Sequence, residues 1–460
     1  MEPISFWRAR LLRHLILDPT ITSYEARPMN EALFSDTATF APYWWDRTPR
    51  PNAGFPSLPK AADVVVIGSG YSGLHAALQT ARAGRSTVVL DAGDLGWGCS
   101  SRNGGQVSAS IKPDLKTLTR QHGADRAQRL IDEGKTSLSW LGSFVREEGI
   151  DCDFQLCGRF HGAHTQRAFD HLARQYGAKS DDTDSDAILI DKAHQQGEIG
   201  TDGYFGGVVF PNHASLDPGR YHQGLLERVV GAGATPVAHC PVTQIEKQGT
   251  GWRLTTANGT ISAREVVVAT NGYTGAATPW LRRRVIPIGS YVIATEPLPE
   301  STMARLMPKG RNITDTRHVV YYYRPSPDGR RILFGGRVSL GETDPRKSGP
   351  KLHQAMSTLF PELVETRISH SWCGFVAYTF DEMMHVGWHD GLHYATGYCG
   401  SGVGMASYLG MRLGHKVVQS DQGETAFDGL TFPTRPFYTG RPWFLSAAVW
   451  YYGMRDRLGL

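Results

Sequence analysis

Three closely spaced glycines are the clearest sign of chemistry in the sequence. They belong to the pattern G-x-G-x-x-G, which the chain carries as Gly68, Ser69, Gly70, Tyr71, Ser72 and Gly73. The first glycine of such a pattern makes a tight turn, the second lets a pyrophosphate approach the backbone, and the third lets a helix pack closely on a strand. The helix that follows offers free N–H groups and a partial positive charge to phosphates. These six residues therefore predict a dinucleotide site.

The segments around the glycines can position such a site. Asp63–Ile67 and Thr87–Leu90 are short apolar runs typical of strands buried on both faces, and Leu74–Ala83 between them has a helix-forming composition. Strand, helix and strand within about 30 residues predict a βαβ unit. Asp91 ends the second strand 18 residues after Gly73, where a carboxylate can accept hydrogen bonds from the adenosine ribose.

Length and composition limit the class of protein. The 460 residues are too many for one core and predict about two to three domains. The 48 basic and 44 acidic side chains nearly balance, so a nucleic-acid partner is not expected. The six cysteines are scattered and match neither a disulfide framework nor a zinc pattern, and no metal is expected.

The residues that follow Asp91 indicate which dinucleotide binds. The run from Ala92 to Gln106 resembles the flavin-contacting segment of the D-amino-acid-oxidase-like FAD superfamily. It is most similar to the gamma-glutamylputrescine oxidoreductase branch, whose members carry G-x-G-x-S-G-R-N-G-G-Q here. This chain departs from the pattern at Ser101, where glycine is usual. The resemblance spans residues 40 to 430 and implies FAD as the cofactor.

The resemblance also implies which residues contact FAD. Beyond the first turn and Asp91, the implied contacts are Ala92, Gly96, Trp97, Gly98, Ser100, Arg102, Asn103, Gly104, Gly105, Gln106, Val242, Ala269, Thr270, Gly400, Ser401, Gly402, Val403 and Gly404. The glycines at 104 and 105 would let backbone N–H groups approach a flat ring. The glycine cluster at 400 to 404 precedes a predicted helix, whose positive end would favour a reduced flavin. Relatives that tether FAD through histidine carry it where this chain has Arg102 and Asn103, so noncovalent FAD is expected.

The substrate site is less clearly marked than the cofactor site. Relatives oxidise amines or amino acids, and they need a dry pocket that places a C–H bond over the flavin. Aromatic walls suit this task because they exclude water and attract cations. Tyr322, Arg337 and Trp372 are the predicted substrate-pocket residues, with Arg337 as a partner for a carboxylate. Further aromatic and arginine candidates are Tyr321, Tyr323, Arg324, Phe375 and Tyr378.

The predicted fold is α/β. A Rossmann-like FAD-binding domain is interrupted by an α+β substrate domain with a mixed or antiparallel sheet. The expected FAD-binding domain comprises residues 61–112, 205–288 and 372–430. The expected substrate domain comprises 113–204 and 289–371, between an N-terminal arm of residues 1–60 and a C-terminal tail of residues 431–460.

These features predict an FAD-dependent oxidoreductase that converts an amine or amino acid C–N bond to an imine by hydride transfer to flavin N5, followed by hydrolysis. Two alternatives stay open: a membrane-associated FAD dehydrogenase that reduces quinone, and an FAD-dependent 2-hydroxy acid oxidoreductase. The electron acceptor is oxygen or quinone. A cytoplasmic location is expected, and peripheral membrane contact stays open because the apolar run Phe444–Met454 is 11 residues long, against the ~20 that span a bilayer.

Overall fold

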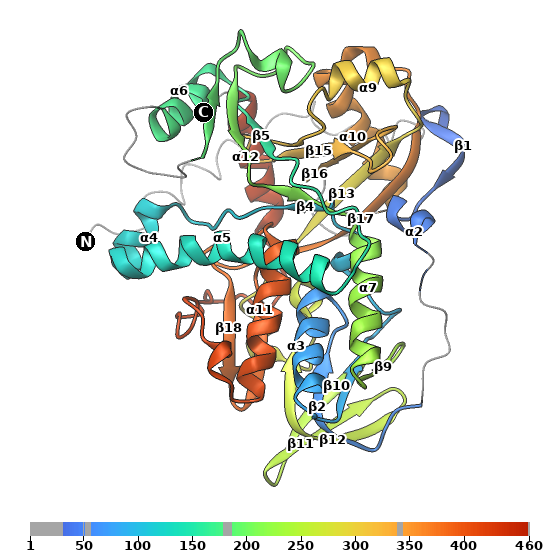
Figure 1. Cartoon of the computed structure of the whole chain (residues 1–460), viewed down its shortest axis with the longest axis vertical. Coiled ribbons are helices and arrows are strands. Elements are labelled where there is room, and N and C mark those ends of the chain that lie inside the picture. The colour runs from blue at the N-terminus through green and yellow to red at the C-terminus, as the bar shows by residue number, and fades with distance from the viewer. Residues whose placement is uncertain (1–30, 49, 51–56, 178–185, 338–343, 459–460) are drawn as a thin grey trace, which may run out of the picture.

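The computed structural model describes residues 31–48, 50, 57–177, 186–337 and 344–458. Figure 1 shows two stacked parts, one built around β2 and β10 to β12 and the other around β13 to β17. Helix α5 (Ala124–Glu147), preceded by α4 (Leu115–His122), runs across the molecule between these two parts.

The first part contains an eight-stranded sheet with the order β10-β11-β12-β2-β3-β9, to which β19 adds beside β12 and β18 beside β19. Its centre is parallel: β12 pairs with β2, β2 with β3, and β3 with β9. These strands are rich in valine and buried, as expected where helices cover a parallel sheet. The bounds are β2 Ala61–Ile67, β3 Thr87–Leu90, β9 Thr235–Val237, β10 Val242–Gln248, β11 Gly251–Thr256, β12 Gly259–Val268, β18 His385–His389 and β19 Leu392–Thr396.

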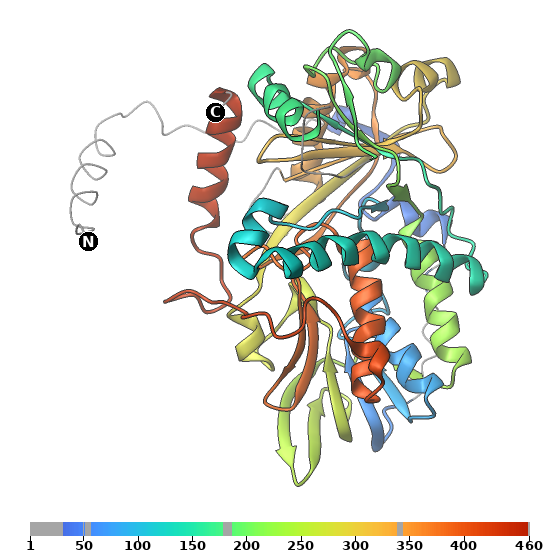
Figure 2. The ribbon, with the colours of Figure 1, turned by 60° about the vertical axis from the view of Figure 1, so that its left-hand side comes forward.

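Three helices stand side by side over this sheet: α3 (Tyr71–Arg82), α7 (Pro218–Gly231) and α11 (Gly402–Val417) (Figures 1 and 2). Glycine permits the close packing of α11 on α3, because a Cβ at Gly410 would lie 2.5 Å from the carbonyl oxygen of Ser72. The helices thereby hold two N-termini, those of α3 and α11, on the same side of the sheet.

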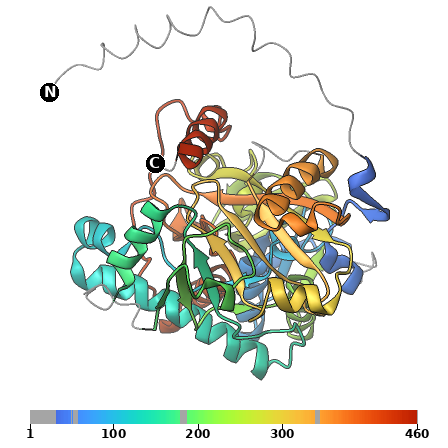
Figure 3. The same cartoon turned by 90° about the horizontal axis from the view of Figure 1, so that it is seen from above.

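The second part contains a nine-stranded sheet with the order β1-β17-β13-β16-β15-β14-β5-β7-β6. Most neighbours are antiparallel, but β14 pairs with β5 and β1 with β17 in parallel, so the sheet is mixed. Figure 3 shows this sheet from above, with α9 and α10 beside it. The bounds are β1 Phe34–Thr39, β5 Arg159–Gly162, β6 Ile188–Ile190, β7 Gly207–Phe210, β13 Ile286–Thr295, β14 Asn312–Asp315, β15 Tyr321–Pro325, β16 Ile332–Gly336, β17 Ile368–Tyr378, α9 Glu300–Leu306 and α10 Pro345–Leu359.

The remaining elements join or flank the two sheets. A short two-stranded sheet pairs β4 with β8, and α12 stands at the margin of the molecule in Figures 2 and 3. The bounds are α2 Tyr43–Arg47, β4 Gln106–Val107, α6 Gln166–Tyr176, β8 Ala214–Ser215, α8 Pro279–Arg282, α12 Leu445–Leu458 and the 3-10 turns Glu31–Leu33, Cys99–Ser101, Gln195–Gly197, Asn271–Tyr273, Pro361–Leu363 and Asp421–Gly423.

The predicted α/β class and the βαβ opening are confirmed, with β2, α3 and β3 in that order. The two-domain division remains a proposal, and the sheets depart from its ranges at two places. Strand β7 falls within 205–288, and most of β17 falls within 372–430, yet both strands pair in the nine-stranded sheet. Apolar strands carry no sequence mark that says which sheet they will join, so these boundaries were not readable from composition.

Candidate active site

The glycine turn has the geometry that its pattern requires. Gly68 has φ +104°, a conformation that favours glycine, and a Cβ at Gly73 would lie 1.9 Å from the carbonyl oxygen of Gly68. A Cβ at Gly70 would lie 2.9 Å from Ser100 Oγ, which accepts a hydrogen bond from the Tyr71 N–H. Helix α3 begins directly after Gly70, so the N–H groups of its first turn have no acceptor within the helix.

Asp91 fixes the turn from the end of β3. Its carboxylate accepts hydrogen bonds from the Ser69 N–H (2.8 Å), the Ser69 hydroxyl (2.5 Å) and the Gly93 N–H (3.1 Å). His222 on α7 supports the same turn, with its Nε2 2.7 Å from the carbonyl oxygen of Ser69. Burial lowers the pKa of His222 to about 4, so its ring is neutral. No motif in the sequence marks this histidine as part of the site. The contact of Asp91 with a ribose stays a prediction.

The loop from Cys99 to Gln106 is held by three tryptophan N–H groups. Trp45 donates to Ser101 Oγ at 2.9 Å, Trp372 donates to the carbonyl oxygen of Arg102 at 2.7 Å, and Trp44 donates to that of Asn103 at 2.8 Å. The side chain of Asn103 in turn accepts from the Gly105 N–H at 2.8 Å. Three consecutive residues of the predicted flavin-contacting loop are therefore fixed from outside the loop.

Two of the predicted substrate-pocket candidates, Trp372 and Arg324, lie outside the cavity described below. Trp372 is 1% exposed and lies behind the loop, so it does not line the cavity described below. Arg324 is 5% exposed and donates to the carbonyl oxygens of Gly105 (3.0 Å) and Leu216 (2.8 Å). Burial lowers the pKa of Arg324 to about 10. Both side chains hold the backbone of the cofactor loop from the side away from the cavity, which sequence alone cannot distinguish from lining it.

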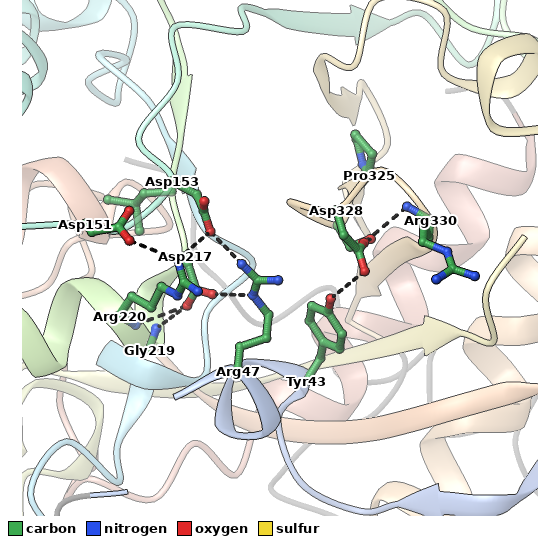
Figure 4. Close-up of polar contacts among 12 residues, drawn as sticks. Tyr43, Arg47, Asp151, Asp153, Asp217, Gly219, Arg220, Pro325, Asp328 and Arg330 are labelled. Carbon is green, nitrogen blue, oxygen red and sulfur yellow. Dashed lines mark hydrogen bonds and ion pairs between the residues drawn. The ribbon is translucent and has the colours of Figure 1, made fainter. Parts of the chain in front are cut away.

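Helix α2 supplies two of those tryptophans and also joins the two parts of the molecule. Arg47 pairs with Asp217, whose side chain is fully buried, at 2.8 Å, and with Asp153 at 2.7 Å (Figure 4). From the same helix the Tyr43 hydroxyl donates to Asp328, in the turn after β15, at 3.4 Å. Burial raises the pKa of Asp217, and the Arg47 guanidinium opposes that effect. The helix thus ties the cofactor loop to both sheets.

A cavity of about 560 Å³ opens on the inner side of the loop. Among the predicted cofactor contacts, those that line it are Tyr71, Ser100, Arg102, Asn103, Gly104, Gln106, Gly400, Ser401, Gly402 and Val403. Gly400 has φ +100°, and α11 begins two residues later with its N-terminus at this cavity. The loop and the second helix N-terminus therefore meet at one place, although they are about 300 residues apart in the chain.

The other predicted cofactor contacts lie outside this cavity. Ala269 adjoins the first turn, because a Cβ at Gly68 would lie 2.8 Å from its carbonyl oxygen, and Thr270 follows it. Val242 begins β10 and is half-buried beside β11. Those that do not line the cavity are Gly68, Ser69, Gly70, Ser72, Gly73, Asp91, Ala92, Gly96, Trp97, Gly98, Gly105, Val242, Ala269, Thr270 and Gly404. Their contacts with FAD stay predictions.

The nine-stranded sheet supplies the opposite wall of the cavity. Tyr322, Phe375, Tyr378 and Arg337 all line it. Tyr322 lies against the loop, since a Cβ at Gly104 would be 3.0 Å from its ring, and burial raises its pKa to about 12. Arg337 donates to the Tyr378 hydroxyl and lies 4.7 Å from the centroid of that ring. Tyr323, by contrast, is fully buried in the sheet's own core and does not line the cavity.

Basic side chains that were not predicted also line the cavity. They are Lys112, Lys135 and Arg159, which line it together with His161, His213 and the carboxyl groups of Asp114 and Asp315. Burial, reinforced by Arg159, lowers the pKa of His161 to about 3 and that of His213 to about 2, so both rings are neutral. Sequence reasoning missed all five basic and histidine residues. Arg159 and His161 lie two residues apart on β5, but Lys112, Lys135 and His213 come from other parts of the chain, so spacing alone does not mark the five as neighbours.

The comparisons with known proteins agree with this geometry. The family model described as "FAD dependent oxidoreductase" (DAO) matches residues 63–415. The chain belongs to the DAO family of FAD-dependent oxidoreductases. It is an enzyme of that family and binds FAD, and the glycine turn, the glycine loop and the two helix N-termini fit such a cofactor.

The chain is similar to several known proteins over most of its length. It is 32% identical over 417 residues to gamma-glutamylputrescine oxidoreductase of Escherichia coli, covering 86% of this chain and 93% of the relative. It is 30% identical over 433 residues to the probable oxidoreductase OrdL of Rhizobium meliloti, covering 90% and 97%. The crystal structure of glycine oxidase from Geobacillus kaustophilus shares the fold, with a TM-score of 0.68 at 20% identity over 82% of this chain and 99% of that one.

Two further findings concern ligands and membranes. Within the residues that the structure describes, no group of three or more histidine, cysteine, aspartate or glutamate side chains could hold a metal ion. No helix in that same part of the chain is both long and apolar enough to cross a bilayer.

Proposed function

We propose that the protein oxidises the C–N bond of an amine or amino acid to an imine, which water then hydrolyses to a carbonyl compound and a free amine. FAD, when bound, supplies the acceptor for the hydride, at flavin N5. The observation that carries the proposal is the cavity between the glycine loop and the aromatic wall of Tyr322, Phe375 and Tyr378. Such a wall excludes water and fixes the orientation of the reacting carbon.

The charges of the cavity support an amine donor. Hydride loss requires the neutral amine, and both burial and neighbouring cations lower the pKa of an amine. Basic residues that line the cavity (Arg102, Lys112, Lys135, Arg159 and Arg337) outnumber its carboxyl groups (Asp114 and Asp315), so the net charge would act in this direction. Arg337 is also the proposed partner of a substrate carboxylate, because a guanidinium binds a carboxylate through two parallel hydrogen bonds. Tyr322 and Arg337 keep their proposed roles at the substrate, and Trp372 takes the role of positioning the cofactor loop.

Anaerobic mixing tests the proposed reaction. The purified protein is combined with primary amines, N-methyl amines, polyamines, amino acids and 2-hydroxy acids, and the flavin absorbance is followed. We expect an amine or amino acid to bleach the flavin. Bleaching by 2-hydroxy acids alone would replace the proposal with the hydroxy-acid alternative. Admitting air afterwards distinguishes the acceptors, because prompt return of the colour identifies oxygen.

Noncovalent attachment of FAD is part of the proposal. Relatives that tether FAD through a late cysteine carry it in the region of Cys373, which here is buried in β17 and does not line the cavity. Acid precipitation is expected to release all of the flavin into the supernatant. Yellow colour retained in the washed pellet would contradict this.

A second candidate function is a dehydrogenase that reduces a membrane quinone. It is favoured by the exposed aromatic residues near the C-terminus, with Phe437 91%, Trp443 73% and Trp450 68% exposed. Arg435 and Arg441 lie on the same segment, and aromatic and basic side chains together suit an anionic bilayer surface. Co-sedimentation with vesicles of phosphatidylglycerol, compared with phosphatidylcholine alone, tests this contact. Reduction of a soluble quinone under anaerobic conditions tests the acceptor.

A further inference from the structure

We propose that Asp456, in the C-terminal helix α12, is a positioning residue for the active-site cavity. It holds the loop between β14 and β15 in the place where both ends of that loop line the cavity. Helix α12 stands at the margin of the molecule (Figures 2 and 3) and lies beyond residue 415, where the match to the family model ends. The inference goes beyond the proposed function, because it concerns how the cavity keeps its shape.

The loop between β14 and β15 comprises residues 316–320. Asp315, directly before the loop, and Val320, its last residue, both line the cavity. Tyr322, two positions after Val320, belongs to the aromatic wall of the same cavity. A displacement of the loop would therefore change the cavity at three lining residues.

Asp315 fixes the inner side of the loop. Its side chain is fully buried and accepts hydrogen bonds from the N–H groups of Arg317 at 3.3 Å and Tyr321 at 3.2 Å. It also forms an ion pair with the Arg317 guanidinium. These contacts hold residues 317 and 321 but not the two residues at the middle of the loop.

Asp456 holds the middle of the loop from outside. One of its carboxylate oxygens accepts from the His318 N–H at 2.9 Å and lies 2.8 Å from His318 Nδ1, and the other accepts from the Val319 N–H at 2.9 Å. The Tyr452 ring, one helical turn earlier, stacks on the His318 ring with centroids 5.2 Å apart. Burial raises the pKa of Asp456, but the N–H groups of Val319 and His318 more than offset that effect and lower it overall. The carboxylate is therefore ionised at neutral pH, and its hydrogen bonds are of the strong, charge-assisted kind.

The helix itself does not account for an acidic residue at this position. Asp456 lies in the last turn of α12, where the helix dipole is negative and a carboxylate is unfavourable. The helix also buries little apolar surface, since Leu445 is buried but Trp450 and Met454 are exposed. A residue that opposes its own helix and binds a neighbouring loop is explained by what it does for the loop.

The start of the loop has its own support. Thr316 Oγ1 accepts a hydrogen bond from the His164 N–H at 3.1 Å and lies 2.6 Å from His164 Nδ1. Burial and the nearby Arg317 lower the pKa of His164, and the Asp456 carboxylate opposes them. Loss of Asp456 should therefore release the middle of the loop while its flanking strands stay folded.

Hydrogen exchange and flavin reduction in the holoenzyme test the proposal. Asp456→Asn keeps the size of the side chain but removes its charge and one acceptor. We expect exchange in peptides that span residues 316–320, read by mass spectrometry, to accelerate at least tenfold at the amides of His318 and Val319. Excess dithionite, at high salt to screen the altered charge, should reduce the bound flavin at least threefold faster, with FAD content unchanged.

Steady-state kinetics and control variants complete the test. With the amine that bleaches the flavin most rapidly, Asp456→Asn should raise KM at least fivefold and change kcat less than twofold. Asp456→Glu, which keeps the carboxylate, should recover most of the loss. Met454→Ala, at an exposed position on the same helix, and Asp125→Asn, which removes an exposed carboxylate from α5, should change none of these measurements.

The outcomes separate this inference from the proposed function. Unchanged exchange in Asp456→Asn would overturn the proposed hold on the loop. Faster exchange with no change in either the dithionite rate or KM would overturn its role at the cavity, and equal effects from Met454→Ala would assign that role to the helix as a whole. If no amine bleaches the wild-type flavin, the proposed function is wrong, while exchange and dithionite reduction still decide the role of Asp456.

Discussion

Gly70 shows how one missing Cβ shapes the cofactor site. The space that its side chain would fill lies against Ser100 Oγ, and the same hydroxyl fixes the start of α3 through the Tyr71 N–H. A larger residue would have to displace either the loop or the helix N-terminus. Both belong to the surface on which a pyrophosphate is expected to bind.

We predict that Gly70→Val folds but purifies without FAD. Its ratio of flavin absorbance to protein absorbance should fall at least tenfold, because the branched side chain occupies the approach of the phosphates. Gly275→Val is the control, since Gly275 is exposed and a Cβ there meets no atom within 4 Å. A fully yellow Gly70→Val protein would place the pyrophosphate elsewhere.

Some residues of the site are marked by a short sequence motif around them, and others are not. The first turn, the loop at 99 to 106 and the cluster at 400 to 404 could be predicted from the sequence. Each is expected to contact the cofactor through backbone N–H groups, and a ligand can approach those groups closely only where glycine leaves out the side chain. Lys112, Arg159, His161 and His213 could not be predicted in this way. Their proximity results from the pairing of β5, β7 and β14 and from the packing of α5, and each residue type is common elsewhere in the chain.

At the scale of elements, helix α2 is the clearest case of structure imposed by tertiary contacts. Five residues are too few to form a stable helix in water. Here the helix is held by the buried ring of Trp44, by Trp45 and by the ion pair of Arg47 with Asp217. The aromatic residues of this segment could be recognised from the sequence as anchors, but their partners in the cofactor loop could not.

We predict that Trp44→Phe weakens both the fold and the cofactor site. Phenylalanine keeps an aromatic ring of smaller size, but it cannot donate a hydrogen bond. The carbonyl oxygen of Asn103 therefore loses its donor, which should lower the free energy of unfolding by about 1–3 kcal/mol. Because the loop loses a contact on its outer side, the Kd for FAD should rise several-fold. Thermal unfolding and FAD titration of the apoprotein measure the two effects. Trp388→Phe, at a position that is 70% exposed, should change neither.

The contact that helix α2 makes between the two parts of the molecule depends on a buried carboxylate. Asp217 has a fully buried side chain, and Arg47 is its ionic partner (Figure 4). Arg47→Met should lower the free energy of unfolding by about 3–5 kcal/mol, because it leaves a buried charge unpaired. The double variant with Asp217→Asn should recover part of that loss, as a urea titration would show. Equal losses in the single and double variants would mean that the pair does not join the two parts.

At the scale of the whole molecule, buried histidines dictate the response to acid. Burial lowers the pKa of His75 to about 3, of His161 to about 3, of His213 to about 2 and of His222 to about 4. In the unfolded chain each would titrate near 6.5. The folded protein therefore keeps them neutral below pH 6.5 while the unfolded chain takes up protons, and stability must fall as the pH falls. Asp315 acts in the opposite sense between 3.8 and about 6, because burial raises its pKa.

The four histidines outnumber the two carboxyl groups whose pKa burial raises, Asp315 and Asp217, so the net effect of acid is destabilising. Two to three net protons correspond to a loss of about 3–4 kcal/mol in the free energy of unfolding between pH 6 and pH 5. Urea titrations at several pH values, with FAD in excess, measure the slope. His75→Gln should reduce it by about 1.4 kcal/mol per pH unit, whereas His171→Gln, at an exposed position, should not. A slope that His75→Gln leaves unchanged would mean that this histidine is protonated in the folded state, and that the core around α3 and α7 is open to water.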